Sequence, residues 1–270
     1  MLDRLGIDGF LGLVEQRLGR TLERLAQDAI APPPPPAKHG HIGIHAQKQP
    51  GLSYIGVVTP VGRLSVEQLR GLADVARRCG SGTIRLTVWQ NLLISDVPQD
   101  RLGEAIASIA ALGLTHEASA LRGGLVACTG NAGCKFAASN TKRHAAELAD
   151  FLEQRLTLDQ PLNIHLTGCH HSCAQHYIAD IGLLGAKVER GDDLIEGYDL
   201  HVGGGSGPEQ KIGGLIRPKL AQDELGPVML GLLRSWLAQR EPGETFHLFC
   251  ARQDDAALTA LAAPVAAVAS

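Results

Sequence analysis

Two stretches of this sequence carry paired cysteines: ACTGNAGCKFA at residues 127–137 and HLTGCHHSCAQ at residues 165–175. The cysteines of the first stretch enclose five residues, and those of the second enclose three. The first stretch precedes a predicted helix, and the second begins as a predicted strand ends, so both pairs lie in loops. Four thiolates on two loops can converge on one centre. These cysteines are Cys128, Cys134, Cys169 and Cys173.

The cysteine spacing bears on which metal group the loops would bind. Four thiolates suit either a tetrahedral zinc ion or an iron–sulfur cluster. Structural zinc usually takes cysteine pairs that enclose about two to four residues. The longer interval therefore favours an iron–sulfur cluster, with zinc or unligated thiols as the alternatives. Cys79 and Cys250, the other two cysteines, lie at or within predicted helices and are interpreted as small core residues.

Composition excludes several classes of protein. The chain has 270 residues, of which 44% are hydrophobic and 20% are charged, so we expect a globular fold. A net charge of −3 gives no basic surplus for nucleic-acid binding. No apolar run reaches the roughly 18–20 residues that cross a membrane. Because the N-terminus does not resemble a secretory signal, the cysteines indicate metal or redox chemistry in the cytoplasm rather than a disulfide framework.

The N-terminal part of the chain is predicted to be a helix followed by a linker. Apolar residues recur at three- and four-residue steps from Leu2 to Leu25, which predicts an amphipathic leading helix within residues 1–30. Five prolines, Pro32 to Pro36, cannot continue a helix and predict a stiff spacer within residues 31–40.

Residues 41–115 show the pattern of a small α+β layer. Ser65 and Gln68 have the spacing of a capping box and predict the start of a helix. A second helix is predicted around Leu102 to Leu112. The predicted order is strand, helix, strand, strand, helix, which favours a ferredoxin-like layer. The three predicted strands are 53–59, 83–88 and 92–97.

Residues 116–262 predict a second, larger α/β layer that contains both cysteine loops. A helix is predicted at 140–156, and another contains Leu225 and Trp236. A short Ala-rich tail at 263–270 ends the chain. The strands predicted in this layer are 162–167, 178–184 and 198–202.

The cysteine stretches and four further segments resemble the siroheme nitrite and sulfite reductases in order and spacing. The likeness is closest to the ferredoxin-type assimilatory nitrite reductases. It covers essentially the whole chain but matches only the C-terminal half of these enzymes, whose two halves repeat one fold. The resemblance implies an α+β fold in which a ferredoxin-like layer precedes a larger layer that binds siroheme and a 4Fe–4S cluster. The further segments are HIGIHAQKQPGLSYIGVVTPVGRLS (41–65), GTIRLTVWQNLLI (82–94), IADIGLLGAK (178–187) and YDLHVGGG (198–205).

The resemblance also implies roles for individual residues. The four loop cysteines would hold the 4Fe–4S cluster, and Cys173 would in addition be the catalytic bridge to the siroheme iron. Backbone amides inside the first cysteine loop, at Thr129, Gly130 and Asn131, would stabilise cluster sulfurs or the haem rim. The glycine-rich segment around Gly204 would approach the siroheme carboxylates, with Lys211 and Arg217 as counter-charges, unless it is only a flexible surface turn.

Two departures from the family pattern concern side chains near the proposed cofactors. His170 and His171 replace a proline–asparagine pair that is common in the family, and either histidine could donate a hydrogen bond to a sulfur. The segment that contains Trp89 has a copy in the other half of the family's enzymes. That copy carries arginine at the position of Trp89. We interpret Arg85 and Trp89 as scaffold residues.

The function implied by the resemblance is reduction of nitrite to ammonium with electrons from ferredoxin. The chain would act with an N-terminal half that is a separate chain or is missing, or it would self-associate. Four alternatives stay open: a sulfite reductase half, an electron-transfer module with a cluster and no haem, a zinc-stabilised fragment, and a metal-free remnant.

Overall fold

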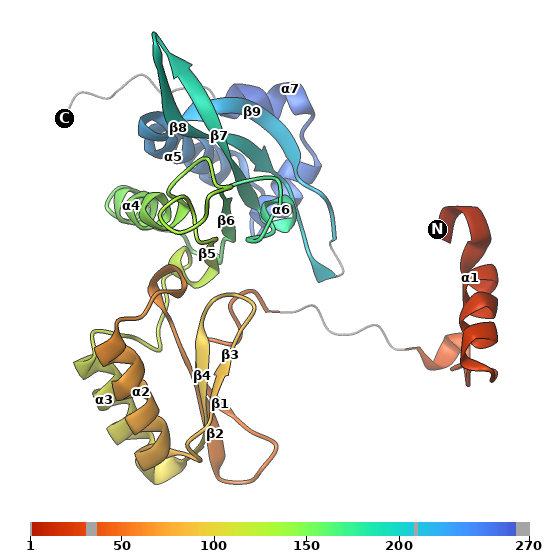
Figure 1. Ribbon diagram of the computed structural model, residues 1–270, viewed down its shortest axis with the longest axis vertical. Coiled ribbons are helices and arrows are strands. Elements are labelled where there is room, and N and C mark those ends of the chain that lie inside the picture. Colours follow the sequence, from red (N-terminus) through yellow and green to blue (C-terminus); the bar gives the residue numbers. More distant parts are fainter. Residues whose placement is uncertain (1, 31–36, 208–209, 263–270) are drawn as a thin grey trace. The chain divides into compact units, whose positions relative to one another are not determined.

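The computed structural model describes residues 2–30, 37–207 and 210–262. Residues 1–35 and 36–270 form two separate units (Figure 1). The predicted proline spacer, Pro32 to Pro36, and the predicted tail at 263–270 lie outside the described residues. None of the described helices is both long enough and apolar enough to cross a membrane.

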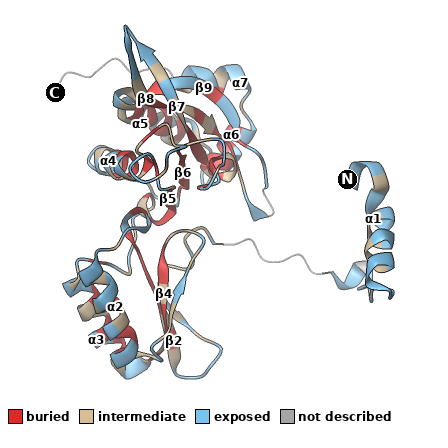
Figure 2. Cartoon of the chain, viewed as in Figure 1, coloured by how far each residue is buried: buried red, intermediate tan, exposed pale blue. Residues whose placement is uncertain are grey.

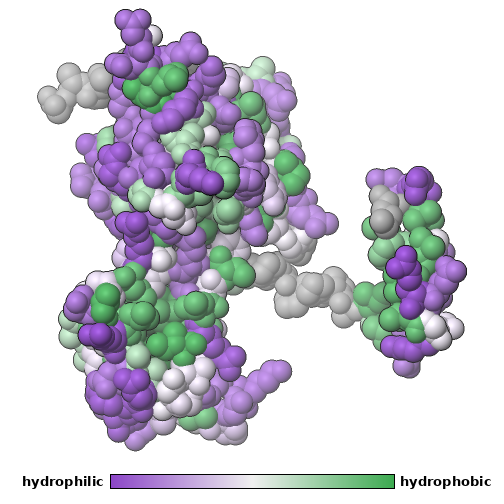
Figure 3. All heavy atoms as spheres, viewed as in Figure 1, coloured by the Kyte–Doolittle hydropathy of each residue, from purple (hydrophilic) through white to green (hydrophobic). Residues whose placement is uncertain are grey.

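The first unit consists of a helix, α1 (Leu2–Leu18), and a short 3-10 turn at Gln27–Ala29. The prediction that the helix continues to Leu25 is wrong. Gly19 follows α1 with a φ of 66°, a left-handed conformation that ends helices and favours glycine. No residue of α1 is buried, and apolar residues lie on its surface (Figures 2 and 3).

Residues 43–111 form a four-stranded antiparallel sheet with two helices. The sheet order is β1-β2-β4-β3. This arrangement confirms the ferredoxin-like layer, but strand β1 was not predicted. It occupies the edge position beside β2. In the β-α-β-β-α-β order this position belongs to the last strand, which follows the second helix. The elements are β1 (Gly43–Ala46), β2 (Leu52–Val57), α2 (Val66–Cys79), β3 (Ile84–Leu86), β4 (Leu92–Pro98) and α3 (Leu102–Ala111).

The two helices of this layer close its hydrophobic core. Ile55 and Ile94 on the sheet and Leu72 on α2 are each 0% exposed and belong to one buried cluster. The predicted capping box at the start of α2 is present: the Gln68 N–H donates to Ser65 Oγ at 3.1 Å, and the Ser65 N–H donates to Gln68 Oε1 at 2.9 Å.

The larger layer contains a five-stranded mixed sheet of order β5-β6-β7-β8-β9. Strands β5, β6 and β7 are parallel, whereas β7, β8 and β9 are antiparallel neighbours. The elements are β5 (Leu125–Ala127), α4 (Thr141–Glu153), β6 (Ile164–Thr167), β7 (Ile181–Arg190), β8 (Asp193–Val202), β9 (Gly214–Ala221), α5 (Gln222–Gln239), α6 (Phe246–Ala251) and α7 (Asp255–Leu261).

Two strand predictions in this layer need correction. The strand predicted at 178–184 begins only at Ile181, because residues His176–Ile178 form a 3-10 turn, and it continues to Arg190. The strand predicted at 198–202 begins earlier, at Asp193, and pairs with the preceding strand along its whole length. Strands β5 and β9 were not predicted.

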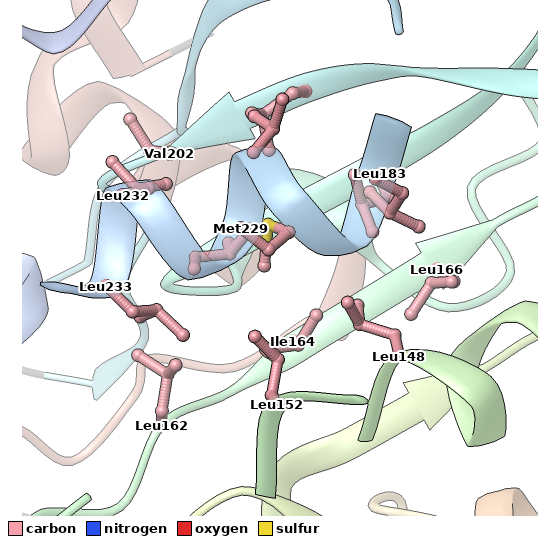
Figure 4. Packing of buried hydrophobic residues seen from close by; sticks show 14 of the residues in the cluster. Leu148, Leu152, Leu162, Ile164, Leu166, Leu183, Val202, Met229, Leu232 and Leu233 are labelled. Atoms are coloured by element: carbon pink, nitrogen blue, oxygen red, sulfur yellow. The ribbon is translucent and has the colours of Figure 1, made fainter. Parts of the chain in front are cut away.

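One hydrophobic core joins α4 and α5 to the sheet (Figure 4). Met229, Leu232 and Leu233 on α5 are each 0% exposed and belong to the same cluster as Ile164 on β6 and Leu152 on α4. Because this core lies against β6, it fixes the strand that leads into the second cysteine loop.

The ferredoxin-like layer contacts the larger layer through Gln90, which follows Trp89 in the turn between β3 and β4. Gln90 Nε2 donates to the Ala127 carbonyl at 2.8 Å, and the Ala127 N–H donates to Gln90 Oε1 at 3.2 Å. A carboxamide carries the same donor and acceptor pair as a peptide group, so Gln90 pairs with the free edge of β5 much as a neighbouring strand would.

Lys142, in the first turn of α4, reinforces this junction. Its ammonium group donates to Gln90 Oε1 at 3.2 Å and to the Val61 carbonyl. Burial, followed by the positive charge of Arg63, lowers the pKa of Lys142 to about 8.

We expect Leu232→Ala to lower the free energy of unfolding by about 2–5 kcal/mol, because it leaves a cavity in a closely packed core. The matched control is Leu194→Ala, since Leu194 is 64% exposed, and it should change the stability by less than about 0.5 kcal/mol. Urea unfolding followed by circular dichroism measures both. Equal losses in the two variants would contradict the assigned core.

Lys142 should give the stability a measurable pH dependence. Between pH 8 and 10.5 the folded chain has released a proton that the unfolded chain still binds. The contribution of Lys142 to the free energy of unfolding therefore rises with pH across this window. In Lys142→Met this rise should be absent, whereas Lys187→Met, at an exposed lysine, should keep it. Urea unfolding at both ends of the window tests this, and a rise retained in Lys142→Met would refute it.

Candidate metal centre

The two cysteine loops leave neighbouring parallel strands at the same edge of the sheet. Cys128 directly follows β5, and Cys169 follows β6 after one glycine. In the strand register Ala127 pairs with Leu166. Because parallel strands point the same way, their carboxyl ends meet at one edge, and both loops begin there.

The loops also contact each other directly. The Gly168 N–H donates to the sulfur of Cys128 at 3.1 Å, and the Ala138 N–H donates to the Gly168 carbonyl at 2.7 Å. The rings of Phe136 and His171, one from each loop, pack edge to face with 5.2 Å between centroids. The two cysteine loops, which are distant in the sequence, thus lie against each other.

The first loop is closed by its own backbone. The Cys134 N–H donates to the Gly130 carbonyl at 2.9 Å, and the Asn131 N–H donates to the Ser139 carbonyl at 3.0 Å. The backbone N–H that we predicted to serve a cofactor at Asn131 is therefore already used within the loop. Thr129 is exposed on the same loop.

The second loop is shaped by two residues in the left-handed conformation. Ser172 and Gln175 each have a φ of 55° and flank Cys173. The Ala174 N–H donates to Thr167 Oγ1 at 3.1 Å, which ties the loop back to the end of β6. Of the two histidines between the cysteines, His171 is the one near a thiol: its Nδ1 lies 3.4 Å from the sulfur of Cys169.

The six thiols fall into two groups by burial. All are free, and Cys79 and Cys250 are buried in α2 and α6, as expected for core residues. Burial raises the pKa of Cys250 to about 12, so this thiol stays protonated and unreactive. The loop thiols are more accessible, with Cys173 exposed and Cys128, Cys134 and Cys169 partly exposed.

The spacing of the donors bears on the kind of metal group. In the part of the chain that the structure describes, no three Cys, His, Asp or Glu side chains lie close enough together to hold one metal ion. A cubane cluster binds each thiolate to a different iron atom, so its ligands stand further apart than the four ligands of one zinc ion. Four free thiols on two loops that contact each other are a donor set that suits a 4Fe–4S cluster.

Two buried imidazoles lie behind the second loop. His165 Nδ1 is 3.2 Å from the Gln175 carbonyl, and among the described residues neither His165 Nε2 nor His176 Nδ1 has a hydrogen-bond partner. Burial lowers the pKa of both histidines to about 4, so both are neutral at physiological pH. These side chains add hydrogen-bonding capacity near the site but no positive charge.

Of the residues predicted to bind siroheme carboxylates, Arg217 has other partners in the structure. Arg217 donates to the Ala262 carbonyl at 2.9 Å and to Glu224 at 3.3 Å, so its guanidinium is directed to the C-terminal helices rather than left as a free counter-charge. Gly204 is buried, and a Cβ there would lie 2.4 Å from the Ala179 carbonyl. Close backbone packing therefore requires glycine at this position. Lys211 is exposed.

Sequence reasoning missed three side chains that support the cysteine loops: Gln90, Lys142 and Glu196. Gln90 binds the backbone of the residue before Cys128. Glu196 on β8 accepts hydrogen bonds from Asn131 and Asn140 in the first loop. No local motif marks these residues, because each acts on a segment distant in the sequence. Trp89 lies against His165, with ring centroids 5.5 Å apart, and belongs to the same junction.

Two family models match the chain. The one described as nitrite/sulfite reductase ferredoxin-like half domain matches residues 45–112, and the one described as nitrite and sulphite reductase 4Fe-4S domain matches residues 119–246. The second match includes both cysteine loops.

The names of similar proteins agree with these family descriptions. A ferredoxin–nitrite reductase of Synechococcus elongatus is 36% identical over 86% of this chain and 45% of its own length. Sulfite reductase (ferredoxin) 1 of Mycolicibacterium paratuberculosis is 37% identical over 93% of this chain and 46% of its own length. The structure of the Mycobacterium tuberculosis NirA protein, 34% identical, covers 95% of this chain and 48% of that chain with a TM-score of 0.85.

The chain therefore spans about half the length of the relatives that it matches. Both family matches agree with the fold, which has a ferredoxin-like layer and two cysteine loops in contact. The chain belongs to the nitrite and sulfite reductase family of siroheme and 4Fe–4S oxidoreductases.

Proposed function

We propose that this chain is the cluster-binding half of a ferredoxin-dependent nitrite reductase, which reduces nitrite to ammonium. The observation that carries the proposal is the meeting of two cysteine loops at one sheet edge, with the Gly168 N–H on the sulfur of Cys128. Support comes from relatives named for this reaction, among them the Synechococcus elongatus enzyme.

The four loop cysteines would hold the 4Fe–4S cluster, and Cys173 would also bind the siroheme iron. Cys173 suits the second role because it is the exposed thiol of the four, so its sulfur has room for a further ligand. When bound, these groups would supply single electrons to an anion at the haem. Two neutral, buried imidazole nitrogens lie behind the same loop: His165 Nε2, which can only accept because its Nδ1–H faces the Gln175 carbonyl, and His176 Nδ1.

The chain's own residues would tune this site through hydrogen bonds to sulfur. The Gly168 N–H donates to Cys128, and His171 Nδ1 lies within reach of Cys169. Such contacts stabilise the negative charge on a thiolate and tune the reduction potential of the group that it binds. His171, rather than His170, is the histidine that we assign to this role.

Partners are part of the proposal. Ferredoxin would donate the electrons, and a second half would complete the haem site, supplied by another chain or by a second copy of this one. Arg217, one of the two cations predicted to face the haem, is directed to Glu224 and Ala262. Positive charge for an acidic cofactor and an anionic substrate would then come mainly from that second half. We place this activity in the cytoplasm.

Sulfite is the second candidate substrate. The relative from Mycolicibacterium paratuberculosis is named a sulfite reductase, and it is about as similar to this chain as the nitrite reductase is. Selectivity between the two anions would be set mainly by side chains of the second half.

We expect the anaerobically purified chain to show siroheme absorption in the visible spectrum, with about four further irons and matching acid-labile sulfide. A brown shoulder without haem bands would indicate a cluster-only module, and a colourless protein with zinc or no metal would refute the proposal. With a reduced donor, ammonium as product identifies nitrite reduction and sulfide identifies sulfite reduction. Fast nitrite reduction by this chain alone, as a monomer, would show that no second half is needed.

Cys173→Ala should lose the siroheme bands and the cluster together, because one thiolate would serve both groups. The matched control is Cys79→Ala, at a buried thiol of α2, which should keep normal iron, sulfide and haem contents. Iron and sulfide analysis with the visible spectrum measures both variants. Retention of haem with a normal spectrum in Cys173→Ala would refute the bridging assignment.

A further inference from the structure

One carboxylate, that of Glu196 on β8, reaches both ends of the segment that carries Cys134. Glu196 Oε1 accepts a hydrogen bond from Asn131 Nδ2 at 2.6 Å, and Glu196 Oε2 accepts one from the Asn140 N–H at 2.9 Å. Asn131 precedes Cys134 by three residues, and Asn140 follows it by six. Of the eight residues between them only Ser139 is buried, so the loop has little core of its own to hold it.

Glu196 lies against a buried pair of side chains. His144 Nδ1 on α4 is 2.8 Å from the Tyr198 hydroxyl, and His144 Nε2, which accepts from the Arg143 guanidinium at 3.0 Å, lies 3.3 Å from Glu196 Oε2. His144 is 1% exposed and Tyr198 is 0% exposed, so Glu196 packs against the core on this side. Burial alone would raise the pKa of Glu196, but the hydrogen bonds from Asn140 and Asn131 lower it below its usual range and keep the carboxylate ionised.

The same contacts connect the loop to the elements on either side of it. Asn140 is also the N-cap of α4, where its side chain accepts from the Arg143 N–H at 3.3 Å. Ser139 Oγ donates to the Gly197 carbonyl at 2.8 Å, next to Glu196 in β8. Hydrogen bonds therefore connect the loop to β8 and to the start of α4, although the chain enters the loop at Cys128 from β5.

We infer that Glu196 is a positioning residue for Cys134, and that its carboxylate fixes the 131–140 segment so that the thiolate is in place before a cluster binds. The inference rests on the proposed function, because it assigns a ligand of the proposed cluster. A loop that is not held must be ordered when the cluster binds, and that ordering weakens binding. Removing a side chain that orients a metal ligand typically lowers the metal affinity about 10- to 100-fold.

The test compares the full-length chain with Glu196→Ala, Glu196→Gln and Asp223→Ala after anaerobic reconstitution with ferrous iron and sulfide. Asp223→Ala removes a carboxylate from the same surface pocket, where it binds Arg190 and not the loop. We expect Glu196→Ala to release iron to a chelator about 10- to 100-fold faster than wild type. Glu196→Gln can still bind both asparagines if the Asn131 amide flips, so it and Asp223→Ala should stay near the wild-type rate.

A second readout does not depend on the cofactor. In the metal-free chain, alkylation followed by mass spectrometry gives the reactivity of Cys134 relative to Cys169, which lies in the other loop and is also partly exposed. This ratio should rise in Glu196→Ala and stay at the wild-type value in Asp223→Ala. A general loss of stability would increase both reactivities together and would contradict the inference.

The outcomes separate the two claims. If the wild-type chain takes up no iron and sulfide, the proposed function fails and the inference fails with it. If the wild-type chain loads and Glu196→Ala releases iron at the wild-type rate, the inference alone is overturned. Should Glu196→Ala not fold, Asn131→Ala at an exposed position removes one of the two hydrogen bonds, and a wild-type release rate in that variant overturns the inference equally.

Discussion

The parallel pairing of β5 with β6 is the constraint on which the candidate metal centre depends. Only this pairing brings loops that start at Cys128 and Cys169 to the same edge of the sheet. A slip of one residue would turn every β5 side chain to the opposite face. Strand β5 has three residues and lies at the edge of its sheet, so it holds its register poorly without help. The carboxamide of Gln90 supplies that help, and the ferredoxin-like layer thereby stabilises the centre without contributing a thiol.

The cysteine spacing, the helix after the first loop and the strand before the second were all predictable from local sequence. Strands β1 and β5 were not, because three or four residues are too few to show an alternating pattern. Their existence depends on partners elsewhere in the chain. The leading helix shows the opposite error: its apolar spacing continues to Leu25, but one glycine in a left-handed conformation ends it at Leu18.

Predictions for residues around the cofactor were weaker than those for the thiols, and the reason is physical. Backbone N–H groups in the first loop looked available because loops lack regular pairing, yet the loop satisfies the one at Asn131 internally. Charged side chains were predicted to be free to bind the cofactor because no opposite charge lies next to them in the sequence. In the fold, however, Arg217 binds partners 7 and 45 residues away. Contacts such as Gln90 with Ala127 and Asn131 with Glu196 span 37 and 65 residues, and only the fold reveals them.

The two loops are held by different means, and this division follows from where each begins. The second loop leaves β6, which has strands on both sides and the hydrophobic core against it, and its own backbone turns and the hydrogen bond from Ala174 to Thr167 direct it. The first loop leaves the edge strand and has no such support, so polar side chains from β8 and from the β3–β4 turn hold it. Substitutions far from any cysteine can therefore disturb the first loop while leaving the second intact. The most exposed of the four loop thiols, Cys173, lies on the loop that needs the least outside support.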